Sequence, residues 1–393
     1  MTATARRARH GATLGLVFGA VLLSGAAAGA WGGTPPAAQL RRAAADAVGG
    51  LPDLSGLTPA QAERLVAAGG DRWAAYYSPQ DYAAFAQGLA GEYLGVGLFV
   101  DRTEDGATVV GELPPGSPAA AAGIAVGDRL LAVDGGPVDR LPVTEVVALL
   151  RGRADGPAGG GHPAGPGSPV RLTVQRGAGP PRELTLRRVL LTAEDVAVDH
   201  PVPGVLWITA RAFTSGVGAR IAAAVRQAPE RGVVLDLRGN SGGLLTEAVA
   251  TASVFLDGGP VASYQVGDER RELTATAGGD GRTPLVVLVD GGTMSAAELL
   301  AGALQDRCRA VLVGGRTFGK GTVQQPSRLA DGSVLERTVG RWFTPAGRSA
   351  DGTGLLPDVL AAEPADAEAL ALRVLGGLGA GTAPPTASPA PSR

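Results

Sequence analysis

Cysteine and histidine are scarce in this sequence of 393 residues. The one cysteine, Cys308, excludes an internal disulfide framework and a cysteine-based zinc site, and we expect it to be a packed structural thiol. The three histidines are His10, His162 and His200. None lies in a nucleophile motif, and no cluster of histidine and cysteine has metal-ligand spacing. A serine–histidine–aspartate triad and a metal-dependent hydrolytic centre are therefore both disfavoured, and no cofactor is predicted.

Lysine is the scarcest charged residue. Of the 35 lysine and arginine residues, only Lys320 is a lysine. Both side chains supply positive charge, but only lysine can lose its proton near neutral pH when it is buried. A sequence that uses arginine elsewhere and keeps lysine here favours a role for a neutral amine. The alternative is the chance survival of one surface lysine.

The neighbours of Lys320 favour the chemical role. Gly319 and Gly321 allow close approach of the backbone on both sides, and Phe318 predicts dry surroundings. Burial lowers the pKa of a lysine from its usual value of about 10.4. At pH 7 that usual value leaves roughly 0.04% of the amine neutral, whereas a pKa near ~7.5 leaves about a quarter neutral. Such a lysine can act as a general base.

A strong excess of positive charge is also absent. The formal net charge is −2, which disfavours binding to nucleic acid and to an anionic membrane face. Glycine and proline are abundant, at 61 and 29 residues, so many loops and short helices are expected. A chain of this length is expected to form two or three domains.

The first 33 residues have the order of an export signal. Arginines at positions 6, 7 and 9 precede an uncharged, apolar run at residues 11–33, and small residues allow cleavage after Ala28 or Ala30. The run also approaches the length that spans a bilayer, so an uncleaved membrane anchor is the alternative. Both predict a protein that works outside the cytoplasm, either secreted or anchored with its domains facing outside.

The remaining chain divides by its hydrophobic pattern into an α/β and α+β multidomain protein. Residues 34–91 carry apolar residues at helical spacing and predict a helical N-terminal region. Residues 92–189 predict short strands and one helix, interrupted by a Gly/Pro-rich insert at 151–169. Residues 190–370 alternate strands with helices. Residues 371–393, rich in proline, alanine and serine toward the end, predict a disordered tail.

A candidate nucleophile lies 25 residues before the lysine. In VVLVDGGTMSAAELLAG, a buried strand ends at Asp290, and a glycine turn leads to a helix that begins near Ser295. Free backbone N–H groups and the helix dipole favour developing negative charge there. Ser295 could instead be a simple N-cap, with Glu298 completing a capping box. The turn glycines together with the lone lysine favour the nucleophile.

Acyl transfer also needs donors for the oxyanion. The segment VVLDLRGNSGGLL supplies a second strand, followed by a glycine-rich turn and a helix. Gly242 and Gly243 can present backbone N–H groups without an obstructing side chain. A tight structural turn is the alternative.

These motifs together resemble the C-terminal processing (tail-specific) peptidases, which are serine proteases with a Ser/Lys dyad and a PDZ domain. DLRGNSGG, GGTMSAAE and RTFGKGTVQ resemble the three catalytic motifs of that family, in order. YLGVGLFV and GSPAAAAGIAVGDRLLAVDG resemble its PDZ module. The resemblance covers about residues 76–359 and implies a PDZ domain followed by a crotonase/ClpP-like α/β catalytic domain.

The resemblance also assigns roles to residues. It implies Ser295 as nucleophile, Lys320 as general base and Gln324 as a residue that orients the amine. The backbone N–H groups of Gly243 and Ala296 match the oxyanion hole. Two further residues, at positions that are polar and supportive in some members, are Glu298 and Asp306. This sequence departs from the family pattern in having Met294 before the serine and Ser241 where proline is frequent.

The PDZ resemblance predicts a binding loop for a chain end. Gly95, Val96, Gly97 and Leu98 would offer backbone N–H groups to a terminal carboxylate, and residues 143–150 would form a helical wall. An ordinary glycine turn is the alternative. The expected partners are protein substrates with apolar C-terminal tails, and self-association is left open.

These features favour an exported serine endopeptidase that binds protein tails through its PDZ domain and works through an acyl-enzyme. A PDZ-containing binding or scaffold protein with a silent catalytic domain is the main alternative. An esterase or amidase acting on small acyl substrates is the second.

Overall fold

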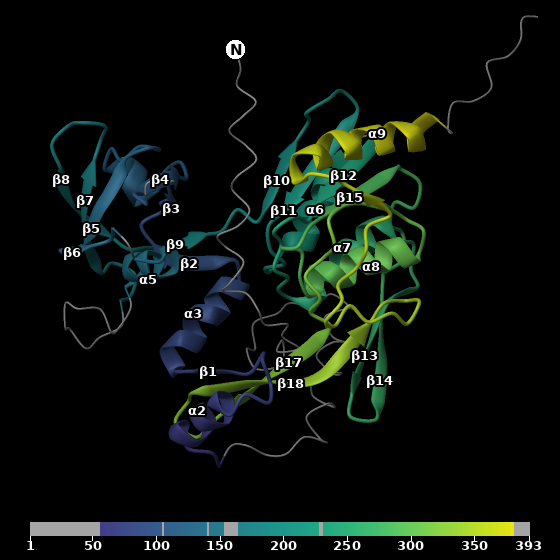
Figure 1. Cartoon of the computed structure of the whole chain (residues 1–393), viewed down its shortest axis with the longest axis horizontal. Coiled ribbons are helices and arrows are strands. Elements are labelled where there is room, and N and C mark those ends of the chain that lie inside the picture. Colours follow the sequence, from purple (N-terminus) through teal and green to yellow (C-terminus); the bar gives the residue numbers. More distant parts are fainter. Residues whose placement is uncertain (1–55, 104–105, 140, 153–163, 228–230, 381–393) are drawn as a thin grey trace, which may run out of the picture. The chain divides into compact units, whose positions relative to one another are not determined.

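The computed structural model describes residues 56–103, 106–139, 141–152, 164–227 and 231–380 (Figure 1). The predicted export segment and the greater part of the Gly/Pro-rich insert lie outside these residues. The chain forms two compact units. We call Gln80–Ala193 the small unit, and Met1–Pro79 with Glu194–Arg393 the large unit.

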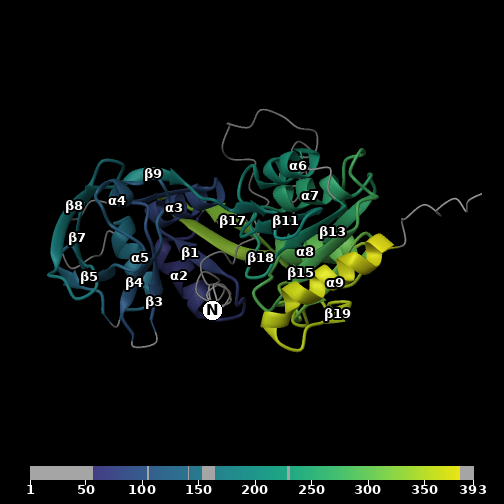
Figure 2. The same ribbon diagram turned by 90° about the horizontal axis from the view of Figure 1, so that it is seen from above.

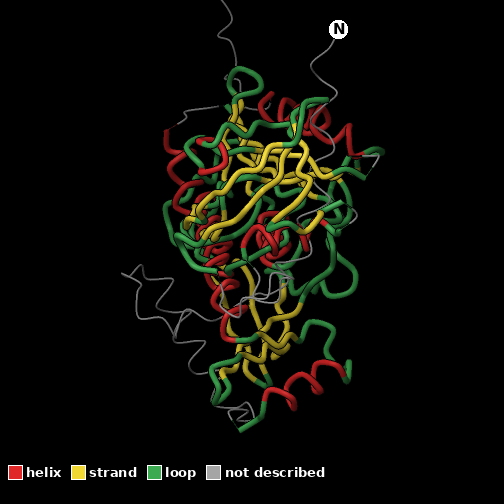
Figure 3. The backbone as a smooth tube through the Cα atoms, turned by 90° about the vertical axis from the view of Figure 1, so that its left-hand side faces the viewer, coloured by secondary structure: helices red, strands yellow, loops and turns green. Residues whose placement is uncertain are grey.

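The small unit is a short-stranded β structure with three helices, of which α3 (Pro79–Leu89) begins at the boundary with the large unit (Figure 3, strands in yellow). One antiparallel sheet has the order β3-β4-β5-β7-β8, with β6 beside β5, and β2 pairs with β9 separately. The bounds are β2 Glu92–Gly95, β3 Phe99–Arg102, β4 Thr108–Glu112, α4 Pro118–Ala121, β5 Arg129–Val133, β6 Gly136–Pro137, α5 Val143–Arg151, β7 Pro169–Gln175, β8 Arg182–Arg187 and β9 Val189–Thr192. The strands and the single long helix predicted for this region are confirmed.

The large unit contains a six-stranded sheet in the order β10-β11-β12-β15-β16-β19, parallel except for β10. Its strands are β10 Val196–Asp199, β11 Val205–Ala210, β12 Gly232–Asp236, β15 Leu285–Val289, β16 Val311–Gly314 and β19 Val359–Leu360. Its helices are α6 Val217–Gln227, α7 Leu245–Phe255, α8 Ala296–Asp306 and α9 Ala367–Ala380. The predicted alternation of strands and helices is therefore confirmed.

Helices cover both faces of this sheet. Because alternate residues of each strand point to opposite faces, consecutive residues of the central strands β12 and β15 are all buried. Val233 and Leu235 of β12 join the core under α7 and α8, while Val234 between them joins the core under α9. Figure 2 shows α9 and the pair α6–α7 on opposite sides of the strands. A continuous apolar run such as VVL is the pattern that this double burial requires.

A second, five-stranded sheet lies beside this layer in the large unit. Its strands are β1 Ala75–Tyr77, β13 Pro260–Val266, β14 Glu269–Thr274, β17 Thr322–Arg328 and β18 Val334–Phe343. Strand β18 pairs with β1, β13 and β17. The pairing with β1 brings a segment from the N-terminal region against β18, which follows β17 and the loop that carries Lys320 (residues 315–321, called the lysine loop below).

The described part of the region 34–91 contains two helices, α2 (Pro59–Ala67) and α3 (Pro79–Leu89). The helical prediction did not include β1, which lies between them and gains its hydrogen bonds from the distant β18. One predicted boundary needs correction. The predicted tail at 371–393 begins too early, because α9 continues to Ala380. Ala371 and Leu375 of α9 are buried against the sheet, and this packing outweighs the local glycine content.

Candidate active site

Ser295 lies at a sharp turn between β15 and α8. Its backbone has φ 58° and ψ −116°, an unfavourable conformation for a residue with a side chain, and such strain costs about 1–3 kcal/mol. The side chain of Asp290 stabilises the turn by accepting hydrogen bonds from the N–H groups of Gly292 and Gly239, both at 2.9 Å. Ser295 is 1% exposed, and its Oγ has no hydrogen-bond partner. The turn thus holds a buried hydroxyl at the start of a helix.

The glycine-rich turn after β12 packs directly against Ser295. A Cβ atom at Gly242 would lie 3.0 Å from Cβ of Ser295 and 3.1 Å from the backbone nitrogen of Ala296. Gly243, with φ 131°, pairs with Phe213 in a single parallel bridge. Among the described residues, the N–H groups of Gly243 and Ala296 have no acceptor. Two free donors therefore lie on segments that meet at the serine.

Lys320 is fully buried. Its exposed fraction is 0%, and Nζ has no hydrogen-bond partner. Nζ lies 4.5 Å from the centre of the Trp73 ring. Burial lowers the pKa of Lys320 to about 8; the carboxylates of Glu336 and Asp71 oppose this decrease, and the Arg72 guanidinium adds to it. The predicted dry environment is confirmed, but Trp73 supplies it and not Phe318, which is 50% exposed.

Glu298 joins the serine turn to the lysine loop. Its Oε2 accepts hydrogen bonds from the backbone N–H groups of Ser295 at 2.9 Å and of Lys320 at 2.8 Å. Its Oε1 accepts from Gly319 N–H at 2.8 Å and from the Thr317 hydroxyl at 2.5 Å. Burial raises the pKa of Glu298, although these donors work in the opposite direction. The carboxyl group is therefore a shared anchor for two segments that are far apart in sequence.

This shared anchor limits the separation of the two candidate catalytic residues. The backbone nitrogens of Ser295 and Lys320 both lie within 2.9 Å of one oxygen, so they are at most about 6 Å apart. The side chains, however, are not hydrogen-bonded to each other, because neither Oγ nor Nζ has a partner. In this conformation the residues are neighbours without a formed dyad.

Gln324 and Asp306 are not close partners of these groups. Gln324 is buried, and its Nε2 donates to Thr322 Oγ1 at 2.8 Å and Thr338 Oγ1 at 3.1 Å, not to Lys320. Asp306 ends α8, about 16 Å along the axis from Ser295. There it accepts a hydrogen bond from Ala346 N–H at 2.8 Å. Support from Asp306 would therefore act through the helix and not by contact.

The predicted carboxylate-binding loop of the small unit connects β2 to β3. Val96 and Leu98 are 2% and 8% exposed, and the Val96 carbonyl accepts a hydrogen bond from Ala119 N–H at 2.9 Å. Gly97 has φ 69°, and a Cβ there would lie 2.3 Å from Cβ of Ser117. Glycine is thus required at this position for both conformation and space. Its role in binding a chain end stays a prediction.

Sequence reasoning missed Trp73, Asp71 and Glu336. Glu336 is 1% exposed, and burial raises its pKa to about 7, while the Lys320 charge and the Tyr77 hydroxyl lower it. One signal could have found it: the position of a glutamate inside the otherwise apolar start of β18. No local pattern marks Asp71 or Trp73, because their contacts are with distant residues.

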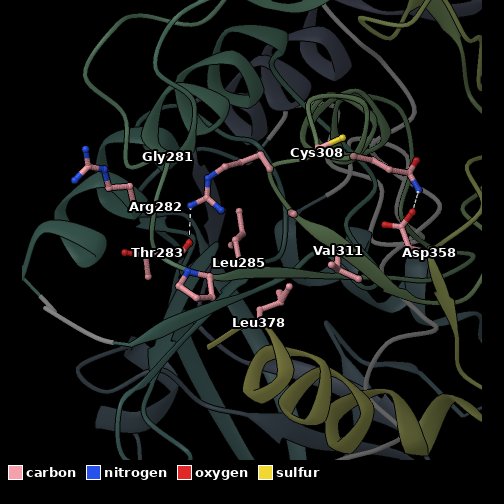
Figure 4. A pocket seen from close by; sticks show the side chains of 12 residues that line it. Gly281, Arg282, Thr283, Leu285, Cys308, Val311, Asp358 and Leu378 are labelled. Atoms are coloured by element: carbon pink, nitrogen blue, oxygen red, sulfur yellow. Dashed lines mark hydrogen bonds between the residues drawn. The ribbon is translucent and has the colours of Figure 1, made fainter. Parts of the chain in front are cut away.

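A hollow of about 440 Å³ lies at the end of the parallel sheet where β15 and β16 begin, opposite the end that carries Ser295 (Figure 4). Thr283 and Leu285 line it at the start of β15, with Val311 at the start of β16 and Cys308 after α8. Parallel α/β sheets bind ligands beyond the carboxyl ends of their strands, where Ser295 follows β15. We therefore assign this hollow no part in the site. Cys308 is exposed, so the prediction of a packed structural thiol at this position is wrong.

Within the described residues, no helix has the length and apolar character needed to span a bilayer. Nor does this part of the chain contain three or more acidic, histidine or cysteine side chains grouped to hold a metal ion.

Two family models match the chain: peptidase family S41 at residues 204–361 and a PDZ domain at residues 109–158. The chloroplastic C-terminal processing peptidase of Tetradesmus obliquus is 37% identical over 316 residues, which cover 75% of this chain and 66% of that protein. The carboxyl-terminal-processing protease of a Picosynechococcus species is 35% identical over 295 residues, which cover 71% and 67%. The chain thus spans about two thirds of the length of these relatives.

A solved structure described as an S41 protease from Bacteroides fragilis is 16% identical, with a TM-score of 0.51 over 85% of this chain and 92% of that chain, and shows the shared fold alone. The predicted carboxylate-binding loop precedes the residues that the PDZ model matches. Together with the similarity to the processing proteases, the two family models place the chain: it belongs to peptidase family S41, among the carboxyl-terminal processing proteases, and it contains a PDZ domain.

Proposed function

We propose that this chain is a serine endopeptidase with Ser295 as nucleophile and Lys320 as general base. One observation carries the proposal: a single buried carboxylate, Glu298, binds the backbone of both residues, and the lysine amine nearby is dry and unpaired. With a pKa of about 8, roughly a tenth of the amine is neutral at pH 7. That is about two hundred times the neutral fraction of an exposed lysine.

The reaction would proceed in two halves. The neutral Nζ of Lys320 takes the proton from Ser295 Oγ, which attacks the carbonyl carbon of the substrate. The N–H groups of Gly243 and Ala296 stabilise the negative oxygen. The resulting ammonium gives its proton to the departing amine, and an acyl-enzyme forms. Water, deprotonated by the same amine, then releases the acyl group and restores the serine.

The alternative is a PDZ-containing scaffold protein with a silent catalytic domain. One observation favours it: Ser295 Oγ and Lys320 Nζ are not hydrogen-bonded to each other. The backbone nitrogens of the two residues are held within about 6 Å, so we propose that side-chain rotation brings Oγ and Nζ together and that this conformation is a resting state of an active enzyme.

A serine-directed fluorophosphonate probe separates the two candidates. We expect the full chain to be labelled, and we expect Ser295→Ala and Lys320→Ala to abolish labelling while circular dichroism shows retained fold. A folded wild-type protein that is not labelled between pH 7 and 10 would support the scaffold. Labelling that survives Ser295→Ala would exclude this serine as the nucleophile.

We further propose that the small unit binds the C-terminal tail of protein substrates, with an apolar preference. The buried loop at residues 95–98 and the adjacent α5 support this, since backbone N–H groups beside an apolar wall can hold a terminal carboxylate. Matched peptides ending in a free carboxylate or an amide test it. We expect the free-acid peptide to bind more tightly and to be cleaved faster. Equal behaviour would argue against tail recognition and would favour an amidase or esterase.

The site of action proposed is outside the cytoplasm, with export directed by residues 1–33. The order of basic, apolar and small residues there supports it. N-terminal sequencing of the protein recovered from cells would distinguish a cut after Ala28 or Ala30 from an intact anchor, and recovery in the cytoplasm alone would contradict export.

A further inference from the structure

The aromatic ring of Trp73 covers the lysine amine. Nζ of Lys320 lies 4.5 Å from the ring centre, is buried and has no hydrogen-bond partner. Trp73 comes from the N-terminal part of the large unit, more than two hundred residues before the lysine. Phe318, next to the lysine loop, meets the Trp73 ring at a centroid distance of 6.0 Å. A single side chain from a distant segment therefore forms one wall of the base's environment.

Contacts with β18 on both sides of Trp73 hold this segment in place. Asp71 accepts hydrogen bonds from Thr338 N–H at 2.6 Å and from Thr338 Oγ1 at 2.9 Å. It also accepts from the Trp73 N–H at 3.0 Å, which fixes the backbone at the ring. On the other side of Trp73, β1 pairs with β18, with Ala75 opposite Glu336. The backbone is therefore fixed on both sides of Trp73, and the position of the ring over Lys320 is fixed with it.

The charged groups that act on the amine come from three elements. Glu336 lies on β18, Asp71 and Arg72 immediately precede Trp73, and Glu298 lies on α8. The three carboxyl groups favour the ammonium form, and Arg72 opposes it. Because most of these charges raise the pKa of Lys320, the exclusion of water must outweigh them to bring that pKa below its usual value.

We propose that Trp73 is a positioning residue that keeps water from Lys320 and thereby increases the fraction of its amine in the neutral form that catalysis requires. This rests on the proposed role of Lys320 as general base. Trp73 would act through the lysine and would not touch the reacting atoms. The N-terminal segment then becomes a functional part of the peptidase site.

Trp73 exerts two opposite effects, and their balance decides the sign of the result. An aromatic face attracts an ammonium, worth about 0.5–2 kcal/mol, which favours the charged amine. Burial disfavours the same charge by up to several pKa units. We expect burial to dominate. Replacing the ring by an apolar side chain without π electrons separates the two effects, since it keeps the amine dry and removes the attraction.

Selective isotope labelling measures the amine directly, because the chain has only one lysine. Lysine carrying ¹³C at the ε-carbon gives one signal, whose shift with pH reports the pKa of Lys320 without any need for activity. We expect a midpoint near 8 in the wild type. In Trp73→Ala we expect a rise of about one unit or more, which means a tenfold loss of neutral amine at pH 7.

Three further variants make the result decisive. Trp73→Leu should keep or lower the midpoint, and Trp73→Phe should keep it. Leu65→Ala, which shortens an exposed side chain on α2, should leave it unchanged. A midpoint in Trp73→Ala that equals or falls below the wild-type value would overturn the proposal. If Trp73→Ala does not fold, the test falls to Trp73→Leu. A midpoint in Trp73→Leu above the wild-type value would overturn the proposal, because that variant still excludes water.

The rate of fluorophosphonate labelling against pH links this result to function. We expect the acid limb of Trp73→Ala to move to higher pH by the same amount as the NMR midpoint. A moved midpoint with an unmoved labelling profile would leave Trp73 as the cover of Lys320 but would contradict Lys320 as the base. The failure of this inference and of the proposed function are thus distinguishable.

Discussion

Two buried cations, one in each unit, are treated in opposite ways. Arg188 of the small unit is 3% exposed, and its guanidinium donates to the carbonyls of Leu150 at 2.8 Å, Pro169 at 2.8 Å and Leu149 at 3.0 Å. Lys320 of the large unit is 0% exposed, and its Nζ has no hydrogen-bond partner. A fully bonded arginine stabilises the fold, while an unbonded lysine is costly.

The contrast supports the proposed role of Lys320 as a general base. Burial lowers the pKa of both residues, but arginine stays charged at any pH a protein meets, and its donors are satisfied. Of the two, only Lys320 can lose its proton when burial lowers its pKa. A buried polar group left unsatisfied in a native structure calls for a functional explanation, and a proton acceptor for Ser295 provides one.

Replacing the buried lysine by arginine should have the largest effect on activity. Lys320→Arg should lower peptide cleavage by about 10³-fold or more, because the guanidinium cannot accept a proton. The residue is fully buried under Trp73, so the larger head group should also cost stability. Lys320→Met is the control for packing: it should fold and be equally inactive. Substantial cleavage by the arginine variant would remove Lys320 as base.

The anchor of the lysine loop is the next point to break. Glu298→Gln places an NH₂ group among four hydrogen-bond donors, so at least one of them loses its acceptor. We expect kcat to fall by about 10²-fold with a small change in KM, since positioning is lost and not substrate binding. Glu247→Gln, on the neighbouring helix α7, is the matched control. Wild-type kcat in Glu298→Gln would show that the shared anchor is dispensable.

The cost of the unpaired amine should appear in the pH dependence of stability. The folded pKa of about 8 lies below the unfolded value of about 10.4. The unfolded state therefore binds more protons between these values, and stability rises with pH across that window. The gain is at most about 3 kcal/mol. Urea unfolding of the wild type should show this rise, and Lys320→Met should lack it.

The raised pKa of Glu336 acts in a separate window. Its folded value of about 7 exceeds the usual glutamate value of about 4.3, so this group favours folding at low pH, and its contribution is lost as pH rises to about 7. Equal slopes of the wild type and Lys320→Met above pH 8 would contradict the buried, neutral lysine.

The reverse exchange should have the smallest effect. Arg188→Lys loses the fork that reaches three carbonyls at once, and we expect a loss of about 1–2 kcal/mol in the stability of the small unit. The rate at which a fluorophosphonate labels Ser295 should be unchanged. Thermal unfolding and labelling rates measure the two outcomes. A variant as stable as the wild type would show that Arg188 is not a structural anchor.

Much of the large unit could be predicted from local pattern. Continuous apolar runs such as VVLVD require strands buried on both faces, and glycine turns lead from them to helices with clear spacing. Strand β1 could not be predicted, because its three residues become a strand only by pairing with β18. The extent of α9 likewise depended on burial of Ala371 and Leu375 against the sheet.

The sequence alone determined the order of the elements, the candidate nucleophile at Ser295 and the exceptional status of Lys320, because composition and short motifs are local properties. Only the tertiary structure decided which groups surround the amine. Trp73, Glu336 and Glu298 reach it from three separate segments. A pKa depends on burial and on charges brought together by folding, and no spacing along the chain records either.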